Sequence, residues 1–299
     1  MEKMGMHCGR MLAAHMKNDE KIYVLDGDLA DSNGAICVHQ QHPERFIMAG
    51  IAEQSMVSVA AGMASVQLKP WVFSFAAFLC YRAYDQIRIG LSQAKMNVKL
   101  VGSHAGGFTG RNGQTHAAIN DIAVMASLPN IHIWSPACKG DLAYAMDRML
   151  KDEHPTYLRL PREPLGDLPS EPKEWYWLKP ARRVTLVATG LSVHIALQVH
   201  KLLSKMNMEV GVINVNKIVP LPESLLHSIN ALCTEIIVIE DHYQVGGLAS
   251  MLSIHRLSCR IHAKGWGMNF TGQSGDYEEI LHHYDLNPHR ICQEVLTLN

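Results

Sequence analysis

Short apolar runs alternate with amphipathic segments along the first half of the chain, and this alternation limits the folds open to it. The strands predicted from these runs span 21–26, 45–49, 70–75, 98–102, 131–134 and 156–160. One helix is predicted before the first strand, at 6–16. Further helices are predicted between the strands, in a segment after Gly50, at 78–91, in a segment from Asn120, and at 139–151. Strands that alternate regularly with helices predict an α/β fold with a doubly wound sheet.

The alternation stops after Arg162, where four prolines and several charges replace the apolar pattern. We therefore predict a first domain at 1–165, a linker at 166–181 and a second α/β domain at 182–299. The second domain begins with a strand at 184–190, a helix at 192–205 and a strand at 210–215, and continues with a strand at 236–240 and a helix from Gly246 to about 257. Its pattern predicts a second doubly wound sheet.

Composition excludes several classes of protein. Apolar residues make up 47% of the 299 residues and charged residues 18%, so a large core is expected. The net charge of −1 argues against a nucleic-acid partner, and no apolar run is long enough for a membrane helix. The seven cysteines show no CxxC spacing, so we expect no metal ligands among them and a reducing, cytoplasmic location.

An isolated acid lies at the start of the small, apolar segment GIAEQSMVSVAAG, at Glu53. Burial in such a helix would remove water from the carboxyl group and disfavour its charged form. A buried carboxyl group that can take up and release a proton is a candidate for general acid–base catalysis. The alternative is an ordinary acid at a helix N-terminus, where it faces the positive end of the helix dipole.

Four further motifs follow in order along the chain. They are the aromatic WVFSFAAFLCY, then RAYDQ, the glycine-rich SHAGGFTGRNGQTH, and SLPNIHIWSPA followed by YLRLPRE. With GIAEQ, this series resembles the C-terminal half of the transketolase family of thiamine-diphosphate enzymes, and RAYDQ is similar to the same segment of 1-deoxyxylulose-5-phosphate synthase. The resemblance implies a pyrimidine-binding domain followed by a transketolase C-terminal-like domain.

The resemblance implies residues for the cofactor. Glu53 matches the glutamate that hydrogen-bonds the aminopyrimidine ring and activates the cofactor. Phe75, Phe78 and Tyr81 resemble the aromatic pocket around that ring, although an ordinary core stripe would have the same spacing. Asp28 follows a predicted strand and would lie near cofactor or substrate, with a loop-capping role as the alternative.

Other matched positions would contact a sugar substrate. Ser32 and Arg162 would bind a phosphate, and Arg10 is a looser match for the same role. His104 and His116 would contact the ketose, and imidazoles near their ordinary pKa suit proton transfer to its hydroxyl groups.

Asn112 stands where the compared transketolases carry an acid. The resemblance implies that this acid accepts a hydrogen bond from the donor sugar, so a neutral Asn112 would favour a modified or deoxy sugar. The alternative is a turn residue, because Asn112 precedes a glycine.

One part of the family pattern is absent. The family binds magnesium and the diphosphate through GDG and a downstream Asn. Here Gly27-Asp28 is followed by Leu29, and no GDG occurs anywhere in the chain. The resemblance therefore implies one subunit of a split enzyme, without metal ligands of its own. An N-terminal-type partner would carry most of the Mg²⁺ site, in an α2β2 heterotetramer.

The activity implied is transfer of a two-carbon ketol unit from a ketose phosphate to an aldose through thiamine diphosphate. Alternatives within the enzymes are the β-type subunit of a 2-oxo-acid dehydrogenase and a deoxyxylulose-phosphate-synthase-type subunit. A non-catalytic regulatory subunit is the alternative from another class.

Overall fold

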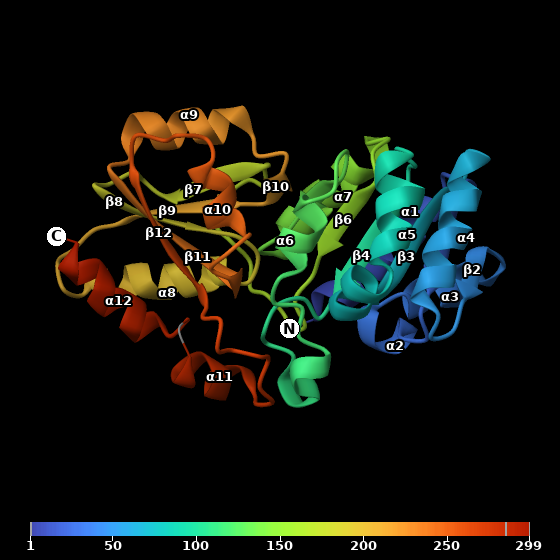
Figure 1. The fold of residues 1–299 in the computed structure, drawn as a ribbon, viewed down its shortest axis with the longest axis horizontal. Helices are drawn as coiled ribbons and strands as arrows, with labels where there is room; N and C mark the ends of the chain where they lie inside the picture. Colours follow the sequence, from blue (N-terminus) through green and yellow to red (C-terminus); the bar gives the residue numbers. More distant parts are fainter. Residues whose placement is uncertain (1, 285, 299) are drawn as a thin grey trace.

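The computed structural model describes residues 2–284 and 286–298, which form two α/β domains side by side (Figure 1). Each domain is built around its own mixed, mostly parallel sheet, which confirms the predicted fold class. No helix in the described ranges is long and apolar enough to cross a lipid bilayer.

The first sheet has seven strands in the order β10-β5-β6-β4-β3-β1-β2. Their bounds are β1 Ile22–Asp26, β2 Phe46–Met48, β3 Lys69–Phe75, β4 Lys99–Ser103, β5 His132–Trp134, β6 Thr156–Arg159 and β10 Lys217–Val219. All pairs are parallel except β10 with β5. The six strands predicted in this region are confirmed to within two residues at each end.

Both faces of this sheet are buried because helices cover each of them. Successive residues of one strand point to opposite faces, so Trp71 joins one apolar cluster and Val72 the other. Such two-sided burial favours strands that are mostly apolar, and β3 and β4 are buried along almost their whole length.

The helices of the first domain are α1 Met4–Met16, α2 Ala30–Asn33, α3 Ile36–Gln41, α4 Glu53–Ser65, α5 Tyr84–Gln86, α6 Asp121–Ala126 and α7 Lys139–Lys151. Short 3₁₀ turns span Pro43–Arg45 and Gly110–Thr115. The helix predicted at 78–91 is less regular than expected. It consists of π-helical turns at Phe78–Arg82 and Ile87–Gln93 on either side of α5, and π-helical turns occur frequently at functional sites.

The second sheet has five strands in the order β12-β11-β8-β9-β7, with β7 antiparallel to β9 and the other pairs parallel. The strands are β7 Trp175–Lys179, β8 Val184–Ala188, β9 Gly211–Val215, β11 Glu235–Tyr243 and β12 Arg260–Trp266. The helices are α8 Ser192–Ser204, α9 Glu223–Leu232, α10 Leu248–Ser253, α11 Tyr277–His283 and α12 Pro288–Thr297.

The division of the chain at 166–181 stays a prediction, and two strands bear on it. Strand β7 lies inside the predicted linker but pairs with β9 of the second sheet. Strand β10 comes from the second part of the chain but extends the first sheet at its edge. The two halves of the chain are therefore joined by strand pairing as well as by the connecting segment.

Candidate functional site

Four neighbouring strands of the first sheet end beside the residues predicted to be functional. The strands β6, β4, β3 and β1 are consecutive in the sheet and parallel. Arg162 follows β6, His104 follows β4, Phe75 ends β3 and Asp28 follows β1. Because the carboxyl ends of parallel strands lie at one edge, a single edge carries residues from four separate motifs.

Glu53 is the first residue of α4, and its side chain is only 1% exposed. Met56, Val57 and Ala60 of the same helix are buried, which brings the helix N-terminus against the edge of β3. One carboxylate oxygen of Glu53 lies 3.4 Å from Ser74 Oγ, and the other accepts a hydrogen bond of 2.6 Å from Arg82 Nη1. Sequence reasoning missed the role of Arg82, although RAYDQ was one of the motifs that it noted.

Aromatic rings and imidazoles form a cluster at this edge. The rings of Phe75 and Phe78 stack with centroids 5.8 Å apart, and His104 lies 4.0 Å from Phe75. His116 packs its edge against Phe78 at 5.1 Å. The two phenylalanines do not share a helix face, because Phe75 ends a strand and Phe78 begins the π-helical turn. Their contact arises from the sharp turn between β3 and that helix.

A cavity of about 350 Å³ lies between the π-helical turn and the end of the glycine-rich loop. Its lining includes Phe78, Tyr81 and Arg82 on one side and Gln114 and Thr115 on the other. The guanidinium group of Arg82 lies 4.7 Å from the centre of the Phe78 ring. The cavity therefore has an aromatic wall, and the buried carboxylate of Glu53 lies behind Arg82.

The hydroxyl group of Tyr81 is held by Asn120, which contacts it through both its side chain and its backbone N–H. This contact fixes the ring at the cavity wall. Asn120 is the N-cap residue of α6, but its side chain makes no capping hydrogen bond to that helix.

His104 is buried, and its backbone has a φ of 54° in the left-handed region. Burial, with a further contribution from the charge of Arg162, lowers the pKa of His104 to about 3. The expectation of an imidazole near its ordinary pKa is therefore wrong for His104, which is neutral at neutral pH. A neutral imidazole offers one hydrogen-bond donor and one acceptor.

Asp28 and Ser32 lie exposed at the end of β1 and on α2. Asp28 has a φ of 65°, a conformation that is uncommon outside glycine and often found at functional sites. The buried acid of this loop is Asp26, which accepts hydrogen bonds from the backbone of Leu29 and the side chain of Asn33. Sequence reasoning missed Asp26, which shapes the loop that presents Asp28.

The remaining predicted residues separate into two groups. Arg162 pairs with Glu163 at 3.1 Å, and its guanidinium packs against Gly110, so it lies beside the glycine-rich loop. Asn112 is exposed in the 3₁₀ turn of that loop. Arg10 of α1, by contrast, forms an ion pair with Glu2, which precedes the helix, and lies outside the cluster around Glu53.

The second domain supports the glycine-rich loop. Asp241 of β11 accepts hydrogen bonds from the backbone N–H of Gly107 at 2.8 Å and from the indole of Trp266 at 2.7 Å. A side chain at Gly106 would place its Cβ 1.7 Å from the Asp241 carboxylate. These two glycines therefore permit close contact between the domains, and Asp241 helps to position the loop that carries His116.

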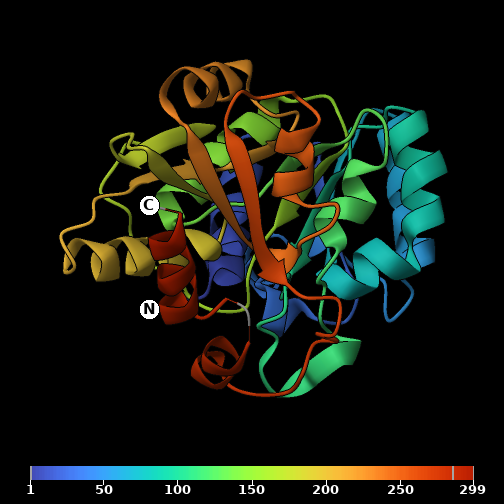
Figure 2. The ribbon, with the colours of Figure 1, turned by 60° about the vertical axis from the view of Figure 1, so that its left-hand side comes forward.

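A second support comes from the segment before α11. Ser274 Oγ donates to the carbonyl of Arg111, and the N–H of Gly275 donates to the carbonyl of Gly110. Figure 2 shows α11 beside the 3₁₀ turn of the loop. The buried guanidinium of Arg159 also binds both domains, donating to Asp121 at 2.8 Å and to the carbonyl of Asp241 at 2.6 Å.

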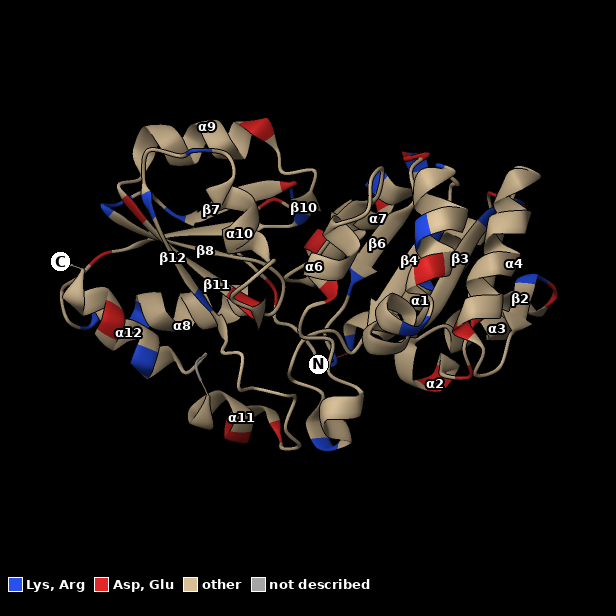
Figure 3. Cartoon of the chain, in the orientation of Figure 1, with Lys and Arg blue, Asp and Glu red and all other residues tan. Residues whose placement is uncertain are grey.

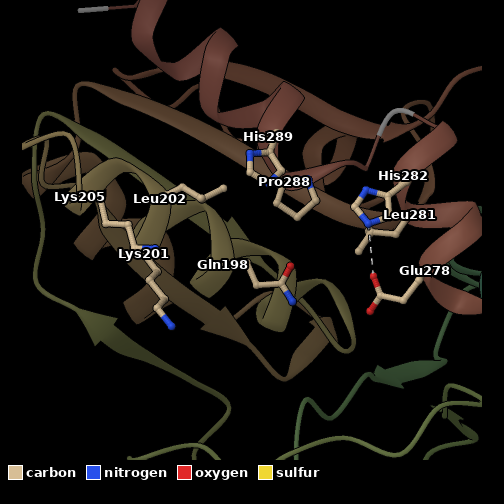
Figure 4. Close-up of a pocket in the computed structure, with 9 residues that line it drawn as sticks. All are labelled: Gln198, Lys201, Leu202, Lys205, Glu278, Leu281, His282, Pro288 and His289. Atoms are coloured by element: carbon tan, nitrogen blue, oxygen red, sulfur yellow. Dashed lines mark ion pairs between the residues drawn. The ribbon is translucent and has the colours of Figure 1, made fainter.

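A separate pocket of about 240 Å³ lies in the second domain, between α8, α11 and α12 (Figure 4). Lys201 and Lys205 extend along one side of it, and an ion pair between His282 and Glu278 lies on the other. None of the predicted site residues lines this pocket. Figure 3 shows acidic and basic residues distributed over both domains in this view.

Two family models match the chain. Residues 3–167 match the family model of the transketolase pyrimidine-binding domain, and residues 173–291 match that of the transketolase C-terminal domain. Because these matches span most of the chain, it belongs to the transketolase family, whose enzymes depend on thiamine diphosphate.

Two curated relatives illustrate the range of the family. A 1-deoxy-D-xylulose-5-phosphate synthase of Clostridium acetobutylicum is 29% identical over 97% of this chain, which spans 48% of that protein. A 6-deoxy-6-sulfo-D-fructose transketolase subunit, SqwH, of Clostridium sp. is 31% identical over 80% of this chain and 76% of the relative. The chain thus spans about half the length of the synthase and most of the length of the subunit.

Solved structures show the same arrangement of domains. A split-gene transketolase described as an inactive beta4 tetramer matches with a TM-score of 0.85 and 28% identity, covering 97% of this chain and 96% of its own. Transketolase from Pichia stipitis in complex with sedoheptulose 7-phosphate has the same fold, with a TM-score of 0.82 and 21% identity over 98% of this chain and 45% of its own.

The residues around Glu53 fit one end of thiamine diphosphate. An aminopyrimidine is a flat aromatic ring with nitrogen atoms that hydrogen-bond a carboxyl group. The cavity offers an aromatic wall at Phe78 and Tyr81, and the Glu53 carboxylate has only a long contact to Ser74 besides its bond to Arg82. The sequence offers no GDG motif for the diphosphate end.

Proposed function

We propose that this chain is the catalytic, pyrimidine-binding subunit of a two-component transketolase that transfers a two-carbon ketol unit from a ketose phosphate to an aldose. The observation that carries the proposal is the buried Glu53 carboxylate beside an aromatic-walled cavity. Support comes from the similarity to a split-gene transketolase over 96% of that chain. The seven cysteines are buried and form no disulfide, which supports a reducing, cytoplasmic location.

Thiamine diphosphate, when bound, supplies a carbanion that adds to the substrate carbonyl. Glu53 would hold the aminopyrimidine nitrogen and exchange a proton with it, a role that suits a desolvated carboxyl group. Phe75, Phe78 and Tyr81 would provide the apolar surface for the ring. The pair of Glu53 with Arg82 would have to open or be shared for this contact to form.

The substrate would lie over the carboxyl edge of the sheet. His104, which is neutral, would donate or accept a single hydrogen bond with a sugar hydroxyl. His116 would act from the other side of the aromatic cluster, and Arg162 and Ser32 would bind the phosphate. Asp28 would position cofactor or substrate from the end of β1.

The partner would be an N-terminal-type subunit that holds the diphosphate and most of the Mg²⁺ site, in an α2β2 assembly. Large apolar side chains lie exposed on β2 and α4, on the residues that flank α4, and on a π-helical turn, at Met48, Ile51, Val59, Val66 and Ile89. Figure 1 shows α4 and β2 at the end of the first domain remote from the second. This surface continues the helix that begins with Glu53, so a partner bound there would close over the site.

A deoxyxylulose-phosphate-synthase-type subunit is the second candidate, favoured by the 29% identity over 97% of the chain. The two candidate reactions differ in their donor, which would be pyruvate for the synthase type and a ketose phosphate for the transketolase type. Product analysis with pyruvate or with a ketose phosphate as donor would distinguish them. A non-catalytic regulatory subunit is the less favoured alternative, because it would not require the buried carboxylate of Glu53 beside the cavity.

The test uses the chain assembled with its partner subunit, thiamine diphosphate and Mg²⁺. Transfer from xylulose 5-phosphate to an aldose should require both subunits. Glu53→Gln should lower kcat by at least about 100-fold, because the amide cannot exchange the proton. The variant should still assemble with the partner. Retention of more than half of kcat would show that Glu53 is structural and that the proposal is wrong.

A further inference from the structure

Two histidines and an aspartate form a cluster at the opposite edge of the first sheet from Glu53. His132 begins β5, Asp152 follows α7, and His154 lies in the loop between α7 and β6. This is the edge where β5 and β6 begin, whereas the candidate active site lies where the strands end. The cluster therefore belongs to none of the chemistry proposed above.

The three side chains converge on one point. His132 Nδ1 pairs with one carboxylate oxygen of Asp152, and His154 Nδ1 lies 2.9 Å from the other. The two imidazole rings stack with centroids 4.5 Å apart. One ligand atom from each residue lies within 4.8 Å of the others, and no other such group of three occurs in the residues that the structure describes.

The backbone that carries these side chains is held by a buried lysine. Lys99 donates hydrogen bonds to the carbonyls of Asp152 at 2.7 Å and His154 at 2.8 Å. The backbone N–H of His132 donates to the carbonyl of Pro155 at 2.9 Å. The loop and the strand are thus fixed relative to each other before any ligand binds, which lowers the entropic cost of forming a site.

We propose that His132, Asp152 and His154 form a binding site for a divalent transition metal ion of the zinc type. Two imidazoles and one carboxylate are a donor set that zinc takes, with bonds of about 2.0–2.2 Å and four-coordinate geometry. Zinc would replace the hydrogen bonds between Asp152 and the two histidines, so the nitrogen and oxygen atoms that now touch would separate by a fraction of an ångström to admit the ion. His154 is 47% exposed, so water can supply the fourth ligand.

The metal would link β5 to the α7–β6 loop and so stabilise the folded chain. Magnesium, which prefers oxygen ligands, is a poor match for this site. Thiol groups do not compete for the metal in the folded chain, because all seven cysteines are buried. The site therefore predicts a metal dependence of stability that is independent of cofactor and partner.

The test is zinc titration of the full-length chain after treatment with a chelator, followed by calorimetry and by thermal unfolding. We expect one equivalent of zinc to bind, and Tm to rise by about 5 °C at a zinc concentration about a hundred times Kd. His154→Ala and Asp152→Asn should each weaken binding at least about tenfold and abolish most of the rise in Tm. The magnesium salt should produce no comparable rise.

His255→Ala is the matched control, because His255 is exposed and lies in the second domain, away from the cluster. It should bind zinc as the wild type does. Asp152→Asn preserves the size of the side chain, so it tests the ligand role if an alanine variant folds poorly. Equal zinc binding by the wild type and both cluster variants would show that the three residues form only a hydrogen-bonded network, as would the absence of a zinc-dependent rise in Tm.

Discussion

Arg82 Nη1 donates a 2.6 Å hydrogen bond to the carboxylate of Glu53, and Arg82 lines the aromatic cavity. Glu53 is almost fully buried, whereas the side chain of Arg82 is 45% exposed. Arg82 thus pairs with an acid that would otherwise have only a long contact to Ser74. A cofactor that hydrogen-bonds Glu53 must compete with Arg82 or share the carboxylate with it.

Replacement of Arg82 should expose the cost of burying Glu53. We expect Arg82→Gln to lower the free energy of unfolding by about 1–2 kcal/mol, discounted for the exposure of the arginine. In a Glu53→Gln background the same change should cost much less, because a neutral amide does not need the cation. Urea unfolding at neutral pH of the wild type, the two single variants and the double variant measures this difference. An equal cost in both backgrounds would show that the two residues are not coupled.

Asn112 should influence the choice of donor sugar in the assembled enzyme. A charged acceptor contributes about 1.5–3 kcal/mol to a hydrogen bond and a neutral one about 0.5–1.5. Asn112→Asp should therefore raise kcat/KM for xylulose 5-phosphate by up to about tenfold relative to deoxy or modified analogues. The measurement is kcat/KM across a panel of donors, with Asn112→Ala as the control. If the ranking does not change, Asn112 is a turn residue.

Gly106 should tolerate no side chain, because the second domain lies against it. Its φ is 89°, and an added Cβ would lie 1.7 Å from Asp241 Oδ2. We expect Gly106→Ala to cost at least about 3 kcal/mol of stability through backbone strain and overpacking.

The control is Gly62→Ala in α4, where no atom lies within 4 Å of the added Cβ. It should raise stability by up to about 1 kcal/mol, since alanine favours the helix. Urea unfolding of both variants tests the pair. A small loss at Gly106 would mean that the loop can move away from Asp241.

Glu240 should make stability depend on pH. Burial raises the pKa of Glu240 to about 7, although the backbone N–H groups of Ala249 and Leu248 donate to it. In the unfolded chain the pKa is about 4.3, so between these values the folded chain keeps a proton that the unfolded chain has released. The resulting stabilisation is complete below about pH 4 and is lost as pH rises through about 7.

Glu240→Gln cannot titrate, so it isolates this effect from other groups. Between pH 5 and pH 8 the wild type should lose about 2–4 kcal/mol relative to the variant. The free energy of unfolding of both proteins at the two pH values measures this loss. Parallel pH profiles would mean that Glu240 remains ionised in the folded chain.

The sequence was a reliable guide to strands β1 to β6 of the first sheet because they are short and mostly apolar. The period of alternation is a local property, and it identified six strands to within two residues. It was less reliable for 78–91, where residues of helical spacing form π-helical turns around α5. Backbone distortion of this kind depends on packing between α4 and α6, which no local pattern records.

The candidate site was predictable in part for a similar reason. Glu53, Phe78 and His104 belong to motifs whose order along the chain is distinctive. The pairing of Glu53 with Arg82, across 29 residues of sequence, depends on how α4 packs against the helical turn. The pKa of His104 likewise depends on burial, which a sequence motif does not specify.

The sequence by itself determined the alternation of strands and helices in the first domain, the family and the absence of a GDG motif, because each of these is written in local residue patterns. Only the tertiary structure decided which residues meet. It placed Asp241 against Gly106 and Gly107, more than 130 residues away, and so gave the second domain a part in shaping the glycine-rich loop. Such contacts arise from the packing of whole domains, where burial and close approach decide which charges and glycines a fold can accept.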